Sequence, residues 1–138
     1  MPRLKKNDPS RLWIERGRAP MPVFIALCLS VEQFDQALSH IKVPMRNRPE
    51  FCGPNVKGST YWYDHPEDEH SCAIVCVLPE EDPVQVVGTL IHEAVHIWQH
   101  VESYTGKMGC FGTEGEAYHI GWISETLIRA YPLRQAEL

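Results

Sequence analysis

The sequence predicts an α+β domain in which a small, mostly antiparallel sheet packs on two C-terminal helices. Short runs rich in β-branched and aromatic residues, bounded by turn-forming residues, are typical of strands. A long segment over 82–105 has the apolar periodicity of a helix, and a second such segment follows it. The length of 138 residues favours one domain, and 43% hydrophobic residues are enough to build its core.

The first half of the chain supplies most of the strands. Nearly half of the lysines and arginines lie in residues 1–20, so we expect a basic N-terminal arm there and a single domain over 21–138. Residues 22–29 form an apolar strand, and Ser30 opens a helix through a capping-box pattern. After a proline-rich loop, residues 59–64 and 71–78 are expected to be two further strands.

The helix over 82–105 carries the pattern that bears on function. Asp82 and Pro83 are typical of a helix start. Its expected apolar stripe consists of Val84, Val87, Ile91, Val95 and Trp98. Off that stripe, residues 92–96 spell H-E-x-x-H, which places His92 and His96 one turn apart on one face. The two imidazoles can bind one Zn²⁺, and Glu93 can take a proton from a metal-bound water.

A catalytic zinc needs a third protein ligand and leaves its fourth position to water. Glu116 stands 20 residues after His96, near the start of the second helical segment, which should stop at Pro132. The pattern resembles the gluzincin branch of the zincin metallopeptidases, which places a glutamate ligand followed by alanine on the next helix. The resemblance covers about residues 58–131 and implies that Glu116 is the third ligand, with Glu114 in reserve. Thr113-x-x-Glu116 also matches a capping box, which would engage the same carboxylate at the helix end.

The resemblance implies a reduced zincin-like domain and a zinc metallopeptidase that hydrolyses peptide bonds through a metal-activated water. It implies one Zn²⁺ per chain, with Glu93 as the general base. The candidate hydrogen-bond donors to the transition state are Tyr118, His119, Tyr104 and Tyr63. The strand over 59–63 would be an edge strand that binds an extended peptide substrate, with Tyr61, Trp62 and Tyr63 on it. Ile120 replaces the aspartate that orients a histidine in thermolysin-like enzymes, so another group must hold that imidazole.

Three alternatives use the same residues differently. A non-catalytic zincin-like protein would bind metal structurally, with His65 or His70 as a further ligand, or would serve as an interaction module. A deformylase-like amidohydrolase would use Cys52, although the residues around it do not match that family's motif. A di-iron protein would use Glu93-x-x-His96 and Glu116-x-x-His119, but it requires a four-helix bundle.

The resemblance implies a peptide or protein substrate, and composition argues against two other kinds of partner. The net charge of −5 argues against general nucleic-acid binding, and no apolar segment is long enough to span a membrane. Five cysteines without a C-x-x-C pair suit reduced thiols in a cytoplasmic protein, and Cys72 and Cys76 fit a strand core. Because so short a chain lacks a second domain to complete a cleft, an oligomer or partner protein could supply the other wall.

Overall fold

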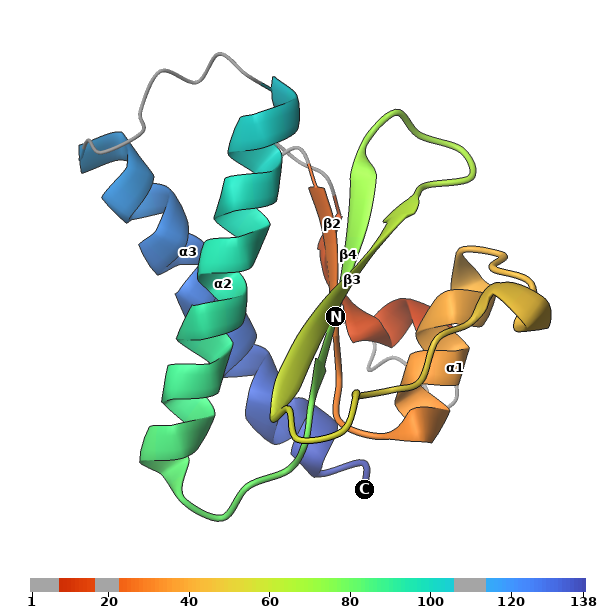
Figure 1. Ribbon diagram of the computed structural model, residues 1–138, viewed down its shortest axis with the longest axis horizontal. Helices are drawn as coiled ribbons and strands as arrows, with labels where there is room; N and C mark the ends of the chain where they lie inside the picture. The colour runs from red at the N-terminus through yellow and green to blue at the C-terminus, as the bar shows by residue number, and fades with distance from the viewer. Residues whose placement is uncertain (1–7, 17–22, 106–113) are drawn as a thin grey trace.

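The computed structural model of the chain describes residues 8–16, 23–105 and 114–138 (Figure 1). Its strands are β1 (Trp13–Arg16), β2 (Val23–Cys28), β3 (Gly58–Asp64) and β4 (Ser71–Val77). Its α-helices are α1 (Val31–His40), α2 (Pro83–Thr105) and α3 (Glu114–Gln135), and two short 3-10 helices are η1 (Pro9–Leu12) and η2 (Met45–Asn47). The α+β class expected from the sequence is confirmed.

The four strands form one sheet in the order β1-β2-β4-β3. The β1–β2 and β3–β4 pairs are antiparallel, whereas β2 and β4 run parallel, so the sheet is mixed. An edge strand, an inner strand and the H-E-x-x-H helix follow one another along the chain as β3, β4 and α2.

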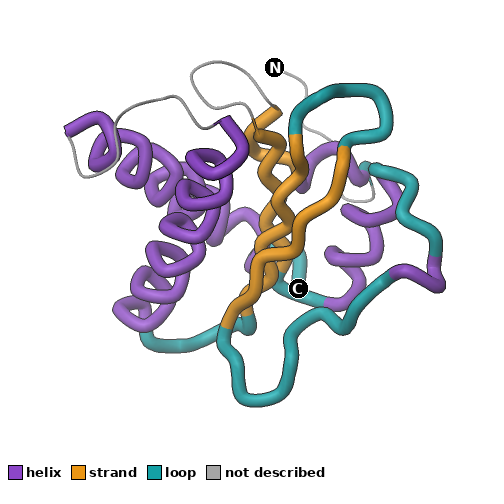
Figure 2. The backbone as a smooth tube through the Cα atoms, turned by 45° about the horizontal axis from the view of Figure 1, so that its top comes forward, coloured by secondary structure: helices purple, strands orange, loops and turns teal. Residues whose placement is uncertain are grey.

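Helices cover both faces of the sheet. Figure 2 shows α2 and α3 on one side of the strands and α1 on the other. Because side chains alternate along a strand, Val75 of β4 packs towards α2 and α3, whereas Ile74 packs towards α1. Cys72 and Cys76 join the α1 side, as expected, and burial raises the pKa of the Cys72 thiol to about 12. Because β4 is buried by an apolar cluster on each face of the sheet, nearly all of its residues are apolar.

The expectation of a basic N-terminal arm over residues 1–20 is wrong for residues 9–16. Residues 9–16 form η1 and β1, and Leu12 and Trp13 are buried in the α1-side core. The basic character of this segment was misleading because Arg11 is itself largely buried, with its guanidinium 2.9 Å from the carboxylate of Glu137. These residues are part of the domain.

The apolar stripe predicted for α2 is also wrong, apart from Trp98. The helix begins as expected, because the Val84 N–H donates to Asp82 Oδ1 at 2.9 Å. However, the Val84 side chain is 76% exposed, and the core face consists of Val86, Leu90, Ala94, Ile97, Trp98 and Val101. So many positions of this helix are apolar that two stripes fit a period of 3.6, and the pattern alone does not choose between them.

The third correction concerns the end of α3, which runs past Pro132 to Gln135. Proline removes one backbone donor and crowds the preceding turn. Tyr131 and Arg134, on either side of it, are buried, and Arg134 donates to the carbonyl of Arg11 at 3.0 Å, which holds the chain in place beyond the proline. The helix therefore continues until its last turn reaches the N-terminal segment.

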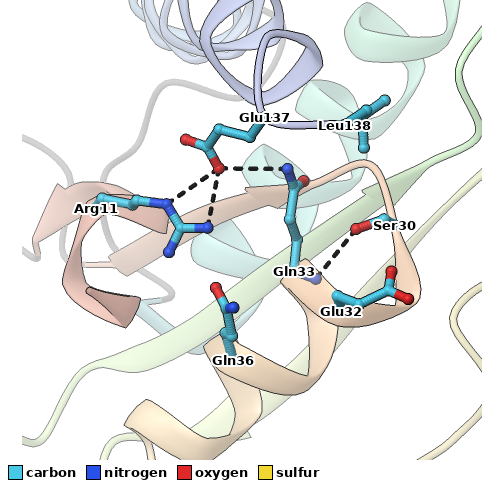
Figure 3. Close-up of a pocket in the computed structure, with 7 residues that line it drawn as sticks. All are labelled: Arg11, Ser30, Glu32, Gln33, Gln36, Glu137 and Leu138. Carbon is cyan, nitrogen blue, oxygen red and sulfur yellow. Dashed lines mark hydrogen bonds and ion pairs between the residues drawn. The ribbon is translucent and has the colours of Figure 1, made fainter. Parts of the chain in front are cut away.

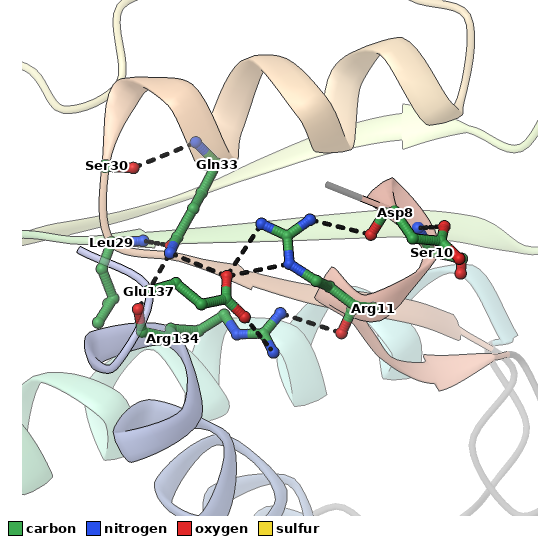
Figure 4. Close-up of polar contacts among 8 residues, drawn as sticks. All are labelled: Asp8, Ser10, Arg11, Leu29, Ser30, Gln33, Arg134 and Glu137. Carbon is green, nitrogen blue, oxygen red and sulfur yellow. Dashed lines mark hydrogen bonds and ion pairs between the residues drawn. The ribbon is translucent and has the colours of Figure 1, made fainter. Parts of the chain in front are cut away.

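A buried polar network joins three distant parts of the chain (Figure 4). Glu137 accepts from Arg11 at 2.9 Å and from Arg134 at 3.2 Å. Gln33 accepts from the Leu29 N–H at 2.7 Å and donates to the carbonyl of Arg134 at 3.0 Å. Arg11, Gln33 and Glu137 also line a hollow of about 510 Å³, and Figure 3 draws them with the other residues around it. The network fixes η1, the start of α1 and the end of α3 to one another.

None of the helices in the described ranges combines the length and the apolar character needed to cross a bilayer.

Candidate functional site

His92 and His96 lie in the middle of α2 with their side chains exposed. Their Nε2 atoms are 3.1 Å apart, and their rings meet nearly edge to face at 78°. A zinc ion about 2.0–2.1 Å from both nitrogens would see them at an angle of about 100°, close to tetrahedral. The separation of the two nitrogens is therefore compatible with two ligands to one ion.

Gln99 is a partner of this pair that the sequence analysis missed. Its Oε1 lies 3.3 Å from Nδ1 of His96. When Nδ1 carries the ring proton and donates it to this oxygen, Nε2 keeps its lone pair on the side facing His92. The i, i+3 spacing from His96 was a usable signal. Gln99 thus supplies the orienting contact that Ile120 cannot.

Glu93 is 3% exposed and is fixed by the edge strand. The hydroxyl of Thr60, on β3, donates to Glu93 Oε2 at 2.6 Å. A buried carboxylate is costly unless hydrogen bonded, and a short bond to a charged acceptor is among the stronger kinds. The second oxygen, Oε1, faces Gly58, at 3.4 Å from where a Cβ there would lie. Thr60 therefore orients the carboxylate.

Two hollows flank these residues. The Lys57 hollow, of about 410 Å³, is lined by Val56, Lys57, Gly58, Gln85, Gly88, Thr89, His92 and Glu93. The Trp62 hollow, of about 480 Å³, is lined by Gly58, Ser59, Thr60, Tyr61, Trp62, His92, Glu93 and His96. Because they share Gly58, His92 and Glu93, they form one depression along β3 and α2, with His92 where they meet and His96 in the Trp62 hollow.

The three aromatic residues proposed for the substrate strand pack on different sides of the sheet. Trp62 faces α2 and stacks on His100, with ring centroids 3.6 Å apart. Desolvation by burial lowers the pKa of His100, which favours a neutral ring under Trp62. Tyr61 and Tyr63 pack on the α1 side of the sheet, and the Tyr61 hydroxyl donates to the carbonyl of Glu50 at 2.7 Å. Of the three, Trp62 alone packs on the α2 side.

Gly58 allows β3 to approach α2 closely. A Cβ at this position would lie 2.9 Å from Cγ2 of Thr89, closer than real Cβ contacts allow. We expect Gly58→Ala to lower the free energy of unfolding by about 1–3 kcal/mol, as overpacked contacts do, measured by urea denaturation.

Gly121→Ala is the matched control for Gly58→Ala. A Cβ at Gly121, inside α3, meets nothing within 4 Å. Because alanine has the higher helix propensity, this change should raise stability by up to about 1 kcal/mol. Equal effects of the two substitutions would show that β3 and α2 are not in tight contact at Gly58.

Glu116 is half-buried in the first turn of α3 and has a polar contact of its own. Across the described ranges, no three His, Cys, Asp or Glu side chains are grouped to hold a metal, so Glu116 is not joined to the histidine pair there. Thr113, the first residue of the alternative capping box, lies outside the described residues. Glu114 is exposed and lines a separate hollow on α3.

Two of the proposed transition-state donors, Tyr118 and His119, lie on α3 and line neither of the two hollows beside the histidine pair. Tyr118 is 72% exposed beside Glu114. His119 stacks on Trp98 between α2 and α3, and its Nδ1 is 2.6 Å from the carbonyl of Gly115. The side chain of Tyr104 is outside the described part of the chain.

The residues behind the rival metal sites are also placed elsewhere. Cys52 packs on the α1 side, with its Sγ 3.7 Å from the carbonyl of Cys76. His65 lies beyond the far end of β3 and stacks on Phe24 at 4.3 Å, and His70 is its neighbour there. The four-stranded sheet does not fit the four-helix bundle of a di-iron carboxylate protein.

Comparison of the chain with models of protein families, with curated proteins and with solved structures finds no match.

Proposed function

We propose that this protein is a zinc-dependent metallopeptidase of zincin type. The observation that carries the proposal is the 3.1 Å separation of the Nε2 atoms of His92 and His96 beside the buried carboxylate of Glu93. The succession of an edge strand, an inner strand and the H-E-x-x-H helix supports the same reading.

The donor set fits zinc as two of its three protein ligands. Imidazole nitrogens suit zinc, and a hydrogen bond from Nδ1 of His96 to Gln99 Oε1 would leave the lone pair of Nε2 to bind the ion. We propose Glu116, in the first turn of α3, as the third ligand, with Glu114 as the alternative. In the described arrangement neither carboxylate is grouped with the two histidines, so the proposal requires the start of α3 to approach them when zinc binds. A bound zinc ion would supply Lewis-acid activation of water and of the scissile carbonyl.

The chain's own groups would then handle the proton and the substrate. Glu93 would accept the proton from the attacking water at Oε1, because Thr60 occupies Oε2. It would later donate that proton to the leaving amine. The free edge of β3 would pair with an extended peptide and place its backbone across the histidine pair. Thr60 would thus act as a positioning residue for the base.

A non-catalytic metal-binding or interaction protein is the second candidate. The observation in its favour is that the described residues bring only two metal donors together. A deformylase-like amidohydrolase has less support, because burial, and then the charge of Glu93, raise the pKa of the Cys52 thiol, which disfavours the thiolate that would bind metal.

Metal content tests the proposal directly. Protein purified without a metal-affinity tag and supplied with Zn²⁺ should hold about one zinc per chain, measured by elemental analysis. His96→Ala should lose it, because one of the two paired nitrogens disappears. Glu116→Ala should bind zinc more weakly by about tenfold or more, because a three-ligand site loses a charged donor.

His65→Ala is the control for these variants, since His65 lies beyond the far end of β3. Its zinc content should equal that of the wild type. Zinc retained in full by Glu116→Ala would move the third ligand elsewhere. A wild-type protein that takes up no zinc would contradict the proposed function.

A further inference from the structure

The Lys57 hollow differs in charge from the rest of the depression. Besides Glu93, the lining of the two hollows contains one further charged side chain among the described residues, the ammonium of Lys57. Lys57 is exposed and stands at the end of the depression beyond His92 and Gly58. Any substrate group that enters this hollow therefore meets a positive charge.

Lys57 contacts Gln85, from the first turns of α2. Its Nζ donates to Gln85 Oε1. Because an ammonium has only protons to offer, the amide oxygen must face it, and the amide NH₂ of Gln85 remains as a donor beside it. The remaining Nζ protons and this NH₂ form a pair of neighbouring donors. Such a pair suits the two oxygens of a carboxylate.

The direction of β3 determines which part of a peptide reaches this pair. The strand runs from Gly58, which borders both hollows, to Trp62, which borders the other hollow alone. A peptide added antiparallel to the free edge of β3 runs from Trp62 towards Gly58. Its residues after the scissile bond therefore enter the Lys57 hollow.

We infer that the Lys57 hollow is a carboxylate-binding subsite for the residue that follows the cleaved bond. The carboxylate is either an acidic side chain or the free C-terminus of a short peptide. Gly88 and Thr89, which also line the hollow, have small side chains. The inference rests on the proposed peptidase function and adds its substrate class.

The test compares three forms of one cleaved peptide, first found by mass-spectrometric screening of a peptide library. One form has glutamate after the scissile bond and an amidated end, one has glutamine there and a free C-terminal carboxylate, and one has glutamine and an amidated end. We expect kcat/KM for one of the two carboxylate forms to exceed that for the neutral form by about tenfold, between the values typical of exposed and buried charged contacts. Which form is preferred distinguishes an acidic side chain from a chain end.

Lys57→Gln should reduce this preference to about twofold or less, chiefly through KM, because the substrate carboxylate loses its partner. Lys42→Gln removes the same charge after α1, on the other side of the sheet, and should keep the full preference. Cleavage with no preference for either carboxylate form, or a preference unchanged in Lys57→Gln, would overturn the inference and leave the peptidase intact.

Binding separates failure of the subsite from failure of the proposed function. Blocked tetrapeptides that end in glutamate or in glutamine are titrated into ¹⁵N-labelled protein, and the amide signals of Gly88 and Thr89 are followed. Shifts that need the carboxylate and vanish in Lys57→Gln would support the subsite even if no peptide is cleaved. Identical shifts with both peptides would overturn it.

Discussion

Glu93→Gln should lower peptide hydrolysis by about 10²–10⁴-fold, the usual contribution of a general base, while the protein keeps its zinc. Glutamine has the shape of glutamate and can still accept from the hydroxyl of Thr60, so the contact between β3 and α2 is preserved. It cannot take a proton from water. Activity on a peptide found by library screening and zinc content by elemental analysis are measured on the same sample.

Glu69→Gln is the control for this substitution, because Glu69 is exposed in the turn between β3 and β4. It makes the same chemical change away from the depression and should keep full activity. A Glu93→Gln protein as active as the wild type would exclude Glu93 as the base. It would favour the non-catalytic alternative if the activity then proved to be a contaminant.

Glu137→Ala should destabilise the fold by about 3 kcal/mol or more, the usual cost of breaking a buried ion pair from one side. The side chains of Arg11 and Arg134 are only 7% and 5% exposed, and both donate to this carboxylate. Desolvation already lowers the pKa of Arg134, so its buried charge depends on this partner. Without Glu137, two buried guanidinium groups would face each other. Urea denaturation at neutral pH measures the loss.

Glu137→Gln should lie between the wild type and the alanine variant, because an amide keeps one acceptor but no charge. Glu125→Ala makes the same change at an exposed position of α3 and should alter stability by less than about 0.5 kcal/mol. An alanine variant as stable as the wild type would mean that water satisfies both arginines.

The sequence predicted the elements better than their packing. Ser30 and Asp82 were correctly identified as helix caps, because their side-chain hydrogen bonds are local. Trp13 was missed as a strand residue because its partner, Ala26, is 13 residues away and the surrounding basic residues resembled a tail. The buried face of α2 was misjudged because its apolar positions outnumber those of a single stripe.

The site shows the same division between local and distant information. The spacing of His92 and His96 is a property of one helix, and the sequence predicted it directly. Thr60 was missed because its contact with Glu93 spans 33 residues and depends on how β3 packs on α2. No pattern within one segment encodes such a contact. The placement of Glu116 also depends on a tertiary arrangement, and it stays a prediction.

The bond between Thr60 and Glu93 makes the chemistry of the depression depend on strand register. Thr60 pairs with Val75 across the β3–β4 ladder, and its hydroxyl reaches α2 only in that alignment. A shift of β3 by one residue would turn every side chain to the other face and leave Glu93 without its donor. The turn over residues 65–70, remote from the histidines, joins the two strands and helps to set this alignment. A sequence change in this turn that shifts the register would therefore break the hydrogen bond between Thr60 and Glu93 without altering any residue that lines the depression.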